Sequence, residues 1–232
     1  MIDLTIIIPV YNESKTVEEL LNRVLSIDLN KQIIVVDDAS SDGSHELLLN
    51  YKSKIDRLIF HEKNLGKGAC IRSAQKYVNG NFVGIQDADL EYHPKDLEKI
   101  VKLMKKNGLD VVYGSRVLGK NKFENAQNFT HLIRIWGNIF LTLISNFINK
   151  QKLTDAHTCY KIIKSDIFKN IKLVENRFAF CPEITTKLAK KDHKITEIPI
   201  NYSGRTYSDG KKISSIDGLV ALYCLLKYRF FK

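Results

Sequence analysis

Short apolar segments alternate with amphipathic ones along the first half of the chain, and this alternation limits the possible folds more than any other feature. Five segments have the length and apolar composition of buried strands: Leu4–Val10, Gln32–Val36, Leu58–His61, Phe82–Gln86 and Asp110–Tyr113. Four segments between them have helical features: Ser14–Ile27, Asp42–Tyr51, Gly66–Val78 and the stretch that begins at Pro94. Strands that are apolar on both faces and alternate with helices predict a mostly parallel α/β sheet flanked by helices. Ligands of such sheets bind beyond the carboxyl ends of the strands.

Three acidic side chains follow the fourth predicted strand at every second position: Asp87, Asp89 and Glu91. In an extended chain they share one face, where carboxylates repel one another unless a cation lies among them. Their hard oxygen atoms suit Mg²⁺ or Mn²⁺, which in turn holds the phosphates of a substrate. Ordinary acids on a solvated loop are the alternative, because Asp-x-Asp alone is a short and common pattern.

The net charge of +10 indicates an anionic partner, which could be nucleic acid, a phosphate-rich substrate or an acidic membrane. Lysines on solvated helix faces are the plain alternative. The chain lacks an RNA- or DNA-binding signature, which argues against nucleic acid.

Its four cysteines have neither metal-ligand nor redox spacing and predict reduced thiols in a cytosolic protein. A strand that starts at once predicts no signal peptide, and no stretch reaches the ~20 apolar residues of a membrane-spanning helix.

The second half of the chain predicts a mobile polar loop at Gly119–Asn128 and then a strongly apolar helix at Phe129–Ile148. The polar residues of that helix form one narrow stripe: Asn138, Thr142, Ser145, Asn146 and Asn149. Such a helix lies either in a core or flat at a membrane interface. Helices are also predicted at Phe180–Ala189 and Ser214–Lys227, with a strand at Ile195–Ile200 between them. The basic and aromatic residues of 227–232 suit an anionic membrane surface or a plain C-terminal helix.

The turn after the first strand reads Pro9-Val10-Tyr11-Asn12-Glu13, so the glycine-rich turn of dinucleotide-binding oxidoreductases is missing. Asn64–Gly68 contains two glycines but lacks the spacing of a P-loop. Gly66 and Gly68 are expected to let backbone approach a ligand, and Lys67 to meet a phosphate.

Five motifs occur in an order and spacing that resembles family 2 glycosyltransferases of the GT-A fold: TIIIPVYNE (5–13), IVVDDASSDG (34–43), NLGKG (64–68), QDADLE (86–91) and GSR (114–116). The chain looks most like the polyprenyl-phosphate sugar transferases of that family, the dolichyl-phosphate mannosyltransferase-like branch. The resemblance covers essentially the whole chain. It implies one GT-A domain over 1–232, with a nucleotide-sugar and metal half at 1–118 and an acceptor half at 119–232. Amphipathic interfacial helices are expected at about 129–148 and 213–229.

The resemblance also implies a set of donor-binding residues: Pro9, Tyr11, Glu13, Asp38, Lys67, Asp87, Ala88, Asp89, Arg205 and Lys211. Asp37 ranks below Asp38, because it could be a structural cap. Asp87, Asp89 and Arg205 are the expected catalytic residues, and Arg205 and Lys211 lie in a basic segment (199–212) expected to clamp the donor diphosphate. Asp87, Asp89 and Glu91 are the expected metal ligands. Glu91 stands where this branch often has glutamine, and its effect on donor preference stays open.

Residues 153–161 resemble a segment beside the acceptor site, with Cys159 where glycine is usual. Arg116 and Arg134 match positions that would hold a lipid phosphate, although Arg134 could merely snorkel from an apolar helix. Asp155 is the candidate general base, or else it fixes its loop through hydrogen bonds.

The implied activity is the inverting, metal-dependent transfer of a hexose from a UDP- or GDP-linked sugar to polyprenyl phosphate, undecaprenyl or dolichyl, at the inner face of a membrane. A lipid phosphate is already anionic near neutral pH, so it needs cations rather than a base, and the chain offers arginines there. An anchor protein or a second copy of the chain is a further expected partner. Two alternatives stay open: a family 2 transferase that extends a surface polysaccharide at a sugar hydroxyl, and a catalytically silent module that binds nucleotide sugar or nucleic acid.

Overall fold

Our computed structural model describes residues 1–119, 129–205 and 215–231, without the side chains of 129–134, 215 and 216. The predicted loop at Gly119–Asn128 therefore falls almost entirely outside the described residues, as do Lys211 and the side chain of Arg134.

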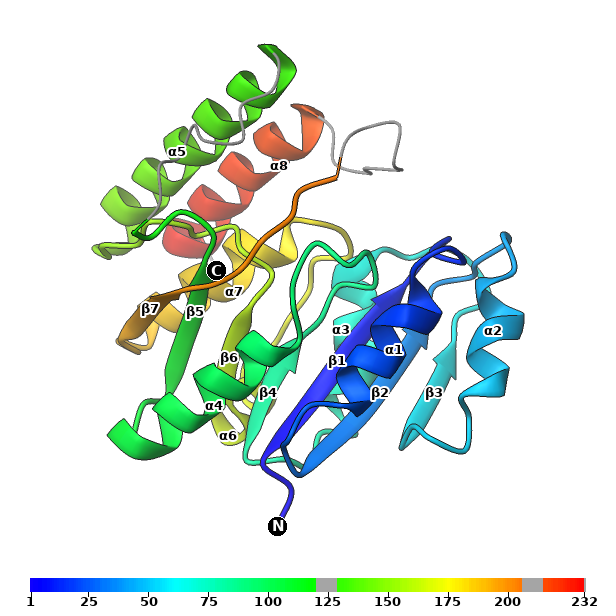
Figure 1. The fold of residues 1–232 in the computed structure, drawn as a ribbon. Helices are drawn as coiled ribbons and strands as arrows, with labels where there is room; N and C mark the ends of the chain where they lie inside the picture. The colour runs from blue at the N-terminus through cyan, green and yellow to red at the C-terminus, as the bar shows by residue number, and fades with distance from the viewer. Residues whose placement is uncertain (120–128, 206–214, 232) are drawn as a thin grey trace.

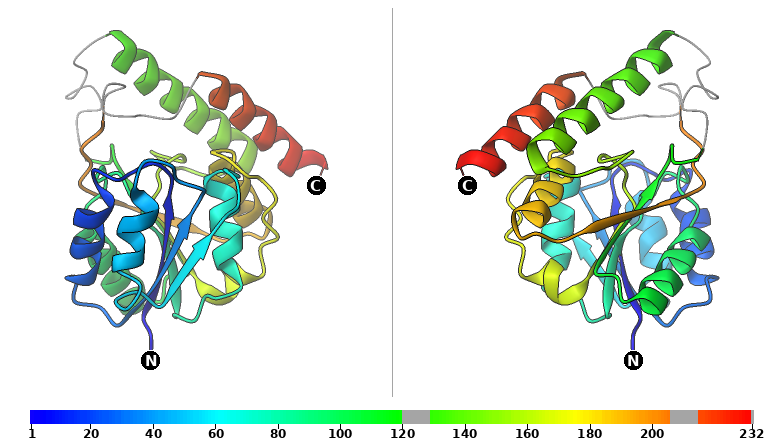
Figure 2. Two further views of the ribbon diagram at one scale, coloured as in Figure 1. Left: turned by 90° about the vertical axis from the view of Figure 1, so that its right-hand side faces the viewer. Right: turned by 90° about the vertical axis from the view of Figure 1, so that its left-hand side faces the viewer.

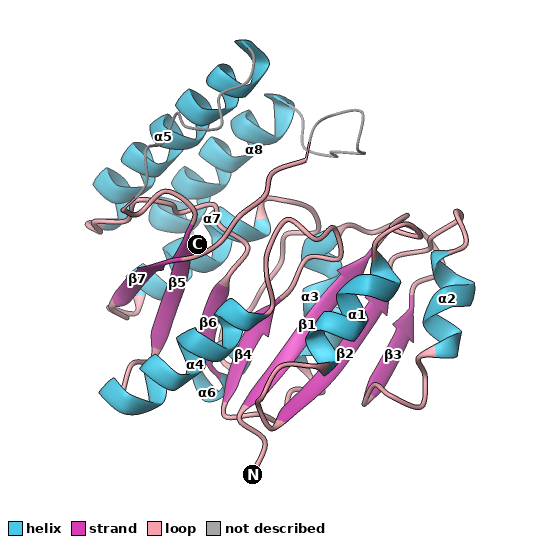
Figure 3. Cartoon of the chain, viewed as in Figure 1, coloured by secondary structure: helices cyan, strands magenta, loops and turns pink. Residues whose placement is uncertain are grey.

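A single sheet runs through the described chain and contains seven strands: β1 (Leu4–Val10), β2 (Lys31–Asp37), β3 (Arg57–Phe60), β4 (Phe82–Ile85), β5 (Val111–Ser115), β6 (Lys161–Lys164) and β7 (Ile195–Pro199). Their order across the sheet is β3-β2-β1-β4-β6-β5-β7 (Figures 1 and 3). Every pairing is parallel except those of β6, which runs antiparallel to β4 and β5. The prediction of a mostly parallel α/β sheet is confirmed. The chain reverses its direction of travel across the sheet between β1 and β4, which is where such sheets bind ligands.

The helices form layers on both faces of the sheet. Their bounds are α1 (Val17–Leu25), α2 (Ser44–Asn50), α3 (Lys67–Gln75), α4 (Lys95–Asn107), α5 (Phe129–Asn149), α6 (Ser165–Lys169), α7 (Phe180–Lys190) and α8 (Ser215–Leu226), which continues into the π-helical turn η1 (Lys227–Phe231). One face is covered by α1, α2 and α4, and the other by α3, α6 and α7 (Figures 1 and 2). Helices α5 and α8 lie side by side across the end of the molecule opposite the N-terminus (Figure 2).

Local sequence explains the elements of the first half. Four of the five apolar residues predicted to form the α1 stripe are buried, namely Val17, Leu20, Leu21 and Val24, and the fifth, Leu25, is half-buried. Strands β1, β2, β4 and β5 are buried along almost their whole length, as their continuous apolar runs predict. Pro94 caps α4, and Gly108 ends that helix with a φ of 62°.

The sequence pattern did not predict strand β6 or the short helix α6. Lys161 opens β6, yet its side chain is only 1% exposed. Its ammonium group donates to the carbonyls of Ala156 (2.9 Å) and Thr158 (2.8 Å) and lies over the ring of Tyr113. A lysine normally signals a solvated position, so only the tertiary contacts of Lys161 allow this segment to become a central strand.

Helix α5 turns its polar side toward the protein and its apolar side outward. The side-chain amide of Asn138 donates a hydrogen bond to Asp155, and that of Asn146 donates to the carbonyl of Leu153. The other three polar residues of the stripe are buried: Thr142, Ser145 and Asn149. The exposed side carries four large apolar side chains at one helical spacing: Trp136, Phe140, Leu143 and Phe147. This orientation excludes the core alternative for the helix.

Helix α8 and η1 carry a second exposed apolar stripe. Four exposed apolar residues follow α8 and η1 at the spacing of the α5 stripe: Leu219, Tyr223, Leu226 and Phe230. On the opposite side of α8, Ala221, Cys224 and Leu225 are buried. Lys227 and Tyr228 of η1 donate hydrogen bonds to Glu175. We call the two exposed stripes of α5 and α8 the apolar platform. Among the described residues, no helix has both the length and the hydropathy needed to cross a membrane.

Candidate functional site

The predicted site residues collect at the carboxyl end of the sheet. The segment 9–13 includes the end of β1, Asp38 follows β2, and the segment 87–91 follows β4 by one residue. Arg116 follows β5, and the segment 200–205 follows β7. The parallel strands end at one edge, so residues far apart in the sequence become neighbours there.

The acidic segment after β4 does not stay extended, and the expectation of three carboxylates on one face is wrong. Residues 88–91 turn, and Leu90 has a φ of 61° in the left-handed region. The three side chains take different partners: Asp87 pairs with Lys67, Asp89 with the guanidinium of Arg205, and Glu91 with the segment 202–205. The backbone turn gives the three carboxylates different partners, although the charges of Asp87 and Glu91 still act on Asp89.

Arg205 and two acids form the centre of the site. Its Nη1 lies 2.9 Å from Glu13 Oε2, and its Nη2 lies 3.1 Å from both Glu13 Oε1 and Asp89 Oδ2. Its Nε is buried and has no hydrogen-bond partner within the described part of the chain. Burial, together with the charges of Asp87 and Glu91, raises the pKa of Asp89 to about 7, although Arg205 opposes this shift. Among the described residues, the four acids Glu13, Asp87, Asp89 and Glu91 outnumber the two cations of the site, Arg205 and Lys67.

Lys67 enters the same region from the first residue of α3. Its ammonium group pairs with Asp87 and lies 3.2 Å from Cys159 Sγ. Burial alone would lower the pKa of Lys67, but Asp87 holds it well above its usual range. Lys67 is therefore a fixed positive charge next to the acidic segment.

Asp38 shapes the loop in front of α3. Its carboxylate accepts hydrogen bonds from the backbone N–H groups of Leu65 (2.9 Å) and Gly66 (2.7 Å), and His61 Nδ1 lies 2.6 Å from it. Asp37 interacts with the backbone N–H of Ser40 and with His45, as a structural cap would. The described contacts of Asp38 position the loop that carries Lys67, and a direct contact with the donor stays a prediction.

The space beside Gly66 and Gly68 is filled by protein backbone. A Cβ at Gly66 would lie 2.5 Å from the carbonyl oxygen of Asn176, and one at Gly68 would lie 2.3 Å from that of Glu175. We expected these glycines to let backbone approach a ligand. Their missing side chains instead admit the segment 175–177, which Arg72 also holds through the carbonyls of Val174 and Glu175.

Gly68→Ala should lower the free energy of unfolding by about 1–3 kcal/mol, because the added methyl group overlaps backbone that cannot move freely. The measurement is denaturant unfolding of both proteins. Gly137→Ala is the matched control, since nothing lies within 4 Å of a Cβ at that exposed helical position. The control should be neutral or slightly stabilising. Equal stability of Gly68→Ala and wild type would contradict the packing role.

Arg116 and Asp155 form an ion pair on the predicted acceptor side, in which Asp155 is buried and Arg116 is half-buried. Asp155 Oδ2 accepts from Arg116 Nε (2.7 Å) and Oδ1 accepts from Nη2 (2.8 Å), while the backbone N–H of Arg116 adds a third bond. Asn138 of α5 also donates to Asp155, at 3.3 Å. Burial alone would raise the pKa of Asp155, but Arg116 holds it well below its usual range. Of its two predicted roles, fixing the loop agrees with these contacts, because such a weakly basic carboxylate is a poor proton acceptor.

The remaining predicted donor-binding residues lie in or next to the strands β1 and β4. Pro9 lies in β1, Tyr11 is half-buried in the turn that follows, and Ala88 is 3% exposed with its carbonyl bonded to Thr16. Sequence reasoning missed two residues that organise the site: Tyr202 and Glu197. Tyr202 contacts Glu91, and Glu197 accepts from the backbone N–H groups of Thr154 and Asp155. Neither carries a local signal, since their partners lie more than 40 residues away in the chain.

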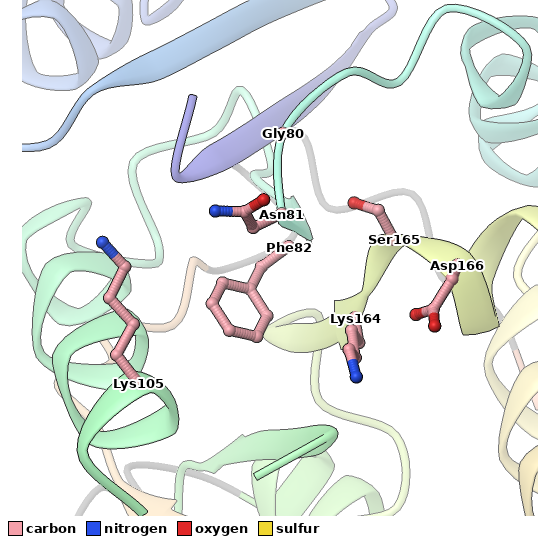
Figure 4. Close-up of a pocket in the computed structure, with 7 residues that line it drawn as sticks. All are labelled: Gly80, Asn81, Phe82, Lys105, Lys164, Ser165 and Asp166. Carbon is pink, nitrogen blue, oxygen red and sulfur yellow. The ribbon is translucent and has the colours of Figure 1, made fainter. Parts of the chain in front are cut away.

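The structure contains two further features that the sequence did not predict. A hollow of about 440 Å³ lies at the amino end of β4, between Phe82, Lys105 and Lys164 (Figure 4), and none of the predicted site residues lines it. Among the described residues, one set of three candidate ligands has its atoms within 4.8 Å of one another: Asp38, His61 and Cys70. Burial raises the pKa of Cys70 far above its usual range, so its thiol stays protonated and is a poor metal ligand.

Comparison with known proteins identifies the family. The model of glycosyl transferase family 2 matches residues 5–172. The chain belongs to this family. An uncharacterised protein of Methanocaldococcus jannaschii is 29% identical over 233 residues, which cover 99% of this chain and 93% of that protein. The dolichol-phosphate mannosyltransferase of Pyrococcus furiosus is 28% identical and matches 89% of this chain and 58% of its own length. The undecaprenyl-phosphate 4-deoxy-4-formamido-L-arabinose transferase of Salmonella choleraesuis is 27% identical and matches 89% of this chain and 62% of its own length.

This family 2 glycosyltransferase thus spans about three-fifths of the length of the two named transferases. Among solved structures, it resembles glucosyl-3-phosphoglycerate synthase of Mycobacterium tuberculosis in complex with Mg²⁺ and uridine diphosphate. The TM-score is 0.71 at 14% identity, over 98% of this chain and 79% of that one. That likeness shows the same fold, and the predicted GT-A fold is confirmed.

Proposed function

We propose that this glycosyltransferase moves a sugar from a nucleoside-diphosphate sugar to a polyprenyl phosphate at a membrane surface. The Pyrococcus and Salmonella relatives are named for transfer to dolichol phosphate and undecaprenyl phosphate, which supports this class of acceptor. Their names specify two different sugars, so the donor has to be found with a panel.

The orientation of α5 is the observation that carries the proposal. Its apolar side faces outward through Trp136, Phe140 and Phe147, and its polar side reaches the Arg116–Asp155 pair through Asn138. A lipid whose chain lies along the apolar platform would thus have its phosphate near a half-buried arginine, Arg116. A water-soluble sugar acceptor would give no reason for four large apolar side chains to face solvent.

The reaction that fits these residues is an in-line displacement with inversion. An oxygen of the acceptor phosphate forms the bond to the anomeric carbon, while the bond from that carbon to the diphosphate breaks and its electron pair leaves with the nucleoside diphosphate. A phosphate monoester is anionic near neutral pH, because its second pKa is near ~6. No side chain has to remove a proton, which agrees with the low basicity of Asp155.

Departure of the diphosphate needs positive charge, and Arg205 is placed to supply it. Its guanidinium already lies between Glu13 and Asp89, with one buried N–H group unpaired among the described residues. Asp87 and Asp89 would hold Mg²⁺ or Mn²⁺, because a divalent cation would relieve the repulsion that the charges of Asp87 and Glu91 exert on Asp89. When bound, that cation would neutralise charge on the leaving diphosphate. The metal and uridine diphosphate in the related synthase structure support this assignment.

The decisive assay offers the purified chain a panel of UDP- and GDP-linked sugars with Mg²⁺ or Mn²⁺, with and without a short polyprenyl phosphate. Lipid-linked product is read by mass spectrometry. The proposal expects product that requires the polyprenyl phosphate. Transfer to free sugar hydroxyls with no use of the lipid would overturn it in favour of the polysaccharide alternative. Binding without any turnover would favour a silent module.

Metal affinity should depend on pH through Asp89. The pKa of Asp89 is raised from 3.8 to about 7, so protons compete with the cation below that pH. Because folding raises the pKa of Asp89, the free energy of unfolding of the metal-free protein should increase as the pH falls through about 7 and Asp89 gains its proton. The bound metal should therefore add more to the free energy of unfolding at higher pH. We expect Mn²⁺ to bind about tenfold more weakly near pH 6 than near pH 8, since one proton must leave. Calorimetric titration at the two pH values measures this, and Asp89→Asn should lose the dependence. An affinity that does not change with pH would contradict the assignment.

A further inference from the structure

We propose that Glu91 is a positioning residue, which latches the segment 199–205 onto the acidic segment, rather than a ligand of the metal. This role depends on the proposed function, in which Arg205 binds the donor diphosphate. It departs from the expectation that Glu91 joins Asp87 and Asp89 around the cation.

Each of the three acceptor atoms of Glu91 accepts a hydrogen bond from one short segment. Its Oε1 accepts from the backbone N–H of Arg205 (2.6 Å) and its Oε2 accepts from the hydroxyl of Tyr202 (3.0 Å). Its carbonyl oxygen accepts from the backbone N–H of Ser203 (2.9 Å). Three hydrogen bonds thus join one residue to a segment more than 110 residues further along the chain.

Neighbouring contacts extend this latch on both sides. Tyr92 and Tyr202 form a β-bridge, and their ring centroids are 5.1 Å apart. Asp96 accepts from the backbone N–H of Asn201 at 2.8 Å. The Arg116 guanidinium lies 5.2 Å from the Tyr202 ring, so Tyr202 stands between the donor-side acids and the acceptor-side arginine. The latch therefore joins the two halves of the site.

The geometry separates the two roles of Arg205. Glu91 holds its main chain, while Glu13 and Asp89 hold its guanidinium. The guanidinium can leave these acids for a diphosphate while the main chain stays in place. A metal ligand at Glu91 would have to share the carboxylate oxygens that already hold the main chain of Arg205 and the hydroxyl of Tyr202.

A carboxylate suits this position because both of its oxygens can accept hydrogen bonds. Glutamine has one accepting oxygen, which could take the N–H of Arg205, while its amide group donates to the hydroxyl oxygen of Tyr202. Glu91→Gln should therefore keep a weaker latch, and Glu91→Ala should lose it.

The test compares Glu91→Ala, Glu91→Gln, Tyr202→Phe and Asp89→Asn by three measurements: Mn²⁺ affinity, deuterium uptake in the peptide that covers 199–205, and affinity for UDP and GDP. Tyr202→Phe is the informative variant, because it weakens the latch without removing any carboxylate and keeps the ring against Tyr92. None of these readouts requires transfer, so a wrong acceptor would not obscure the result.

We expect Glu91→Ala to increase deuterium uptake and to weaken nucleotide binding about tenfold, the scale of one or two lost hydrogen bonds. Tyr202→Phe should shift both in the same direction by a smaller factor, and Glu91→Gln should lie near wild type. Mn²⁺ affinity should change less than about threefold in these three variants and fall at least tenfold in Asp89→Asn. The latch is overturned if Glu91→Ala loses Mn²⁺ as Asp89→Asn does while its deuterium uptake and that of Tyr202→Phe stay at the wild-type level.

Discussion

Asp89→Asn should reduce transfer at least a hundredfold and leave the chain folded. The substitution removes the charge that would hold the cation and that pairs with Arg205 at 3.1 Å. Loss of one such electrostatic group typically reduces turnover about 10²–10³-fold. The reduction should appear at saturating donor and metal, in the assay with the panel-selected sugar.

Asp89→Asn should not lower the stability of the metal-free protein, although it lowers activity. Burial and the neighbouring acids raise the pKa of Asp89 to about 7, so the ionised carboxylate destabilises the metal-free fold above that pH. Asparagine is uncharged, and the melting temperature of the metal-free variant near pH 8 should equal or exceed that of wild type. The control is Asp110→Asn, a half-exposed acid 3.6 Å from Lys164, which should retain full activity. Near-normal turnover of Asp89→Asn would contradict its place in the site.

The double variant Leu143→Ser with Phe147→Ser should bind membranes about a hundredfold more weakly than wild type. Both side chains belong to the apolar platform and are 61% and 88% exposed. Burial of each in the interfacial region of a bilayer would contribute about 1.5–3 kcal/mol, which is at least tenfold in affinity. The measurement is flotation with vesicles of phosphatidylglycerol and phosphatidylcholine.

The fold should tolerate this change, because neither side chain contributes to the buried core. Leu49→Ser in α2 is the matched control, since Leu49 is 46% exposed and lies outside the apolar platform. It should float as wild type does. Flotation of the double variant at the wild-type level, or failure of the wild-type protein to bind these vesicles, would contradict the membrane role of the platform.

Local patterns predicted most of the first half of the chain. The stripe of α1 and the apolar runs of β1, β2 and β4 appear in the structure close to their expected bounds, because helix and strand periodicity reports directly which side is buried. The same logic failed at 87–91, where Leu90 turns the backbone. It also failed at β6, where the buried ammonium group of Lys161 bonds two carbonyls that no sequence pattern reveals.

The site residues divide in the same way. Their identities follow from motifs a few residues long, and five such motifs in order sufficed for the family and its GT-A fold. Their partners do not follow. Arg205 contacts Glu13, Asp89 and Glu91 across more than 110 residues, and Asp155 is held by Arg116 across 39 residues.

By itself the sequence therefore determined the class of the sheet, the family and the residue types of the site, because each of these follows from short-range patterns. Only the tertiary structure decided that α5 turns its apolar side outward, that Gly66 and Gly68 admit protein backbone, and that Glu91 bonds the segment after β7. These outcomes depend on which surfaces meet at the carboxyl edge of the sheet. Periodicity along the chain can show that α5 has two different sides, but the packing of 153–156 against its polar side decides which one faces outward.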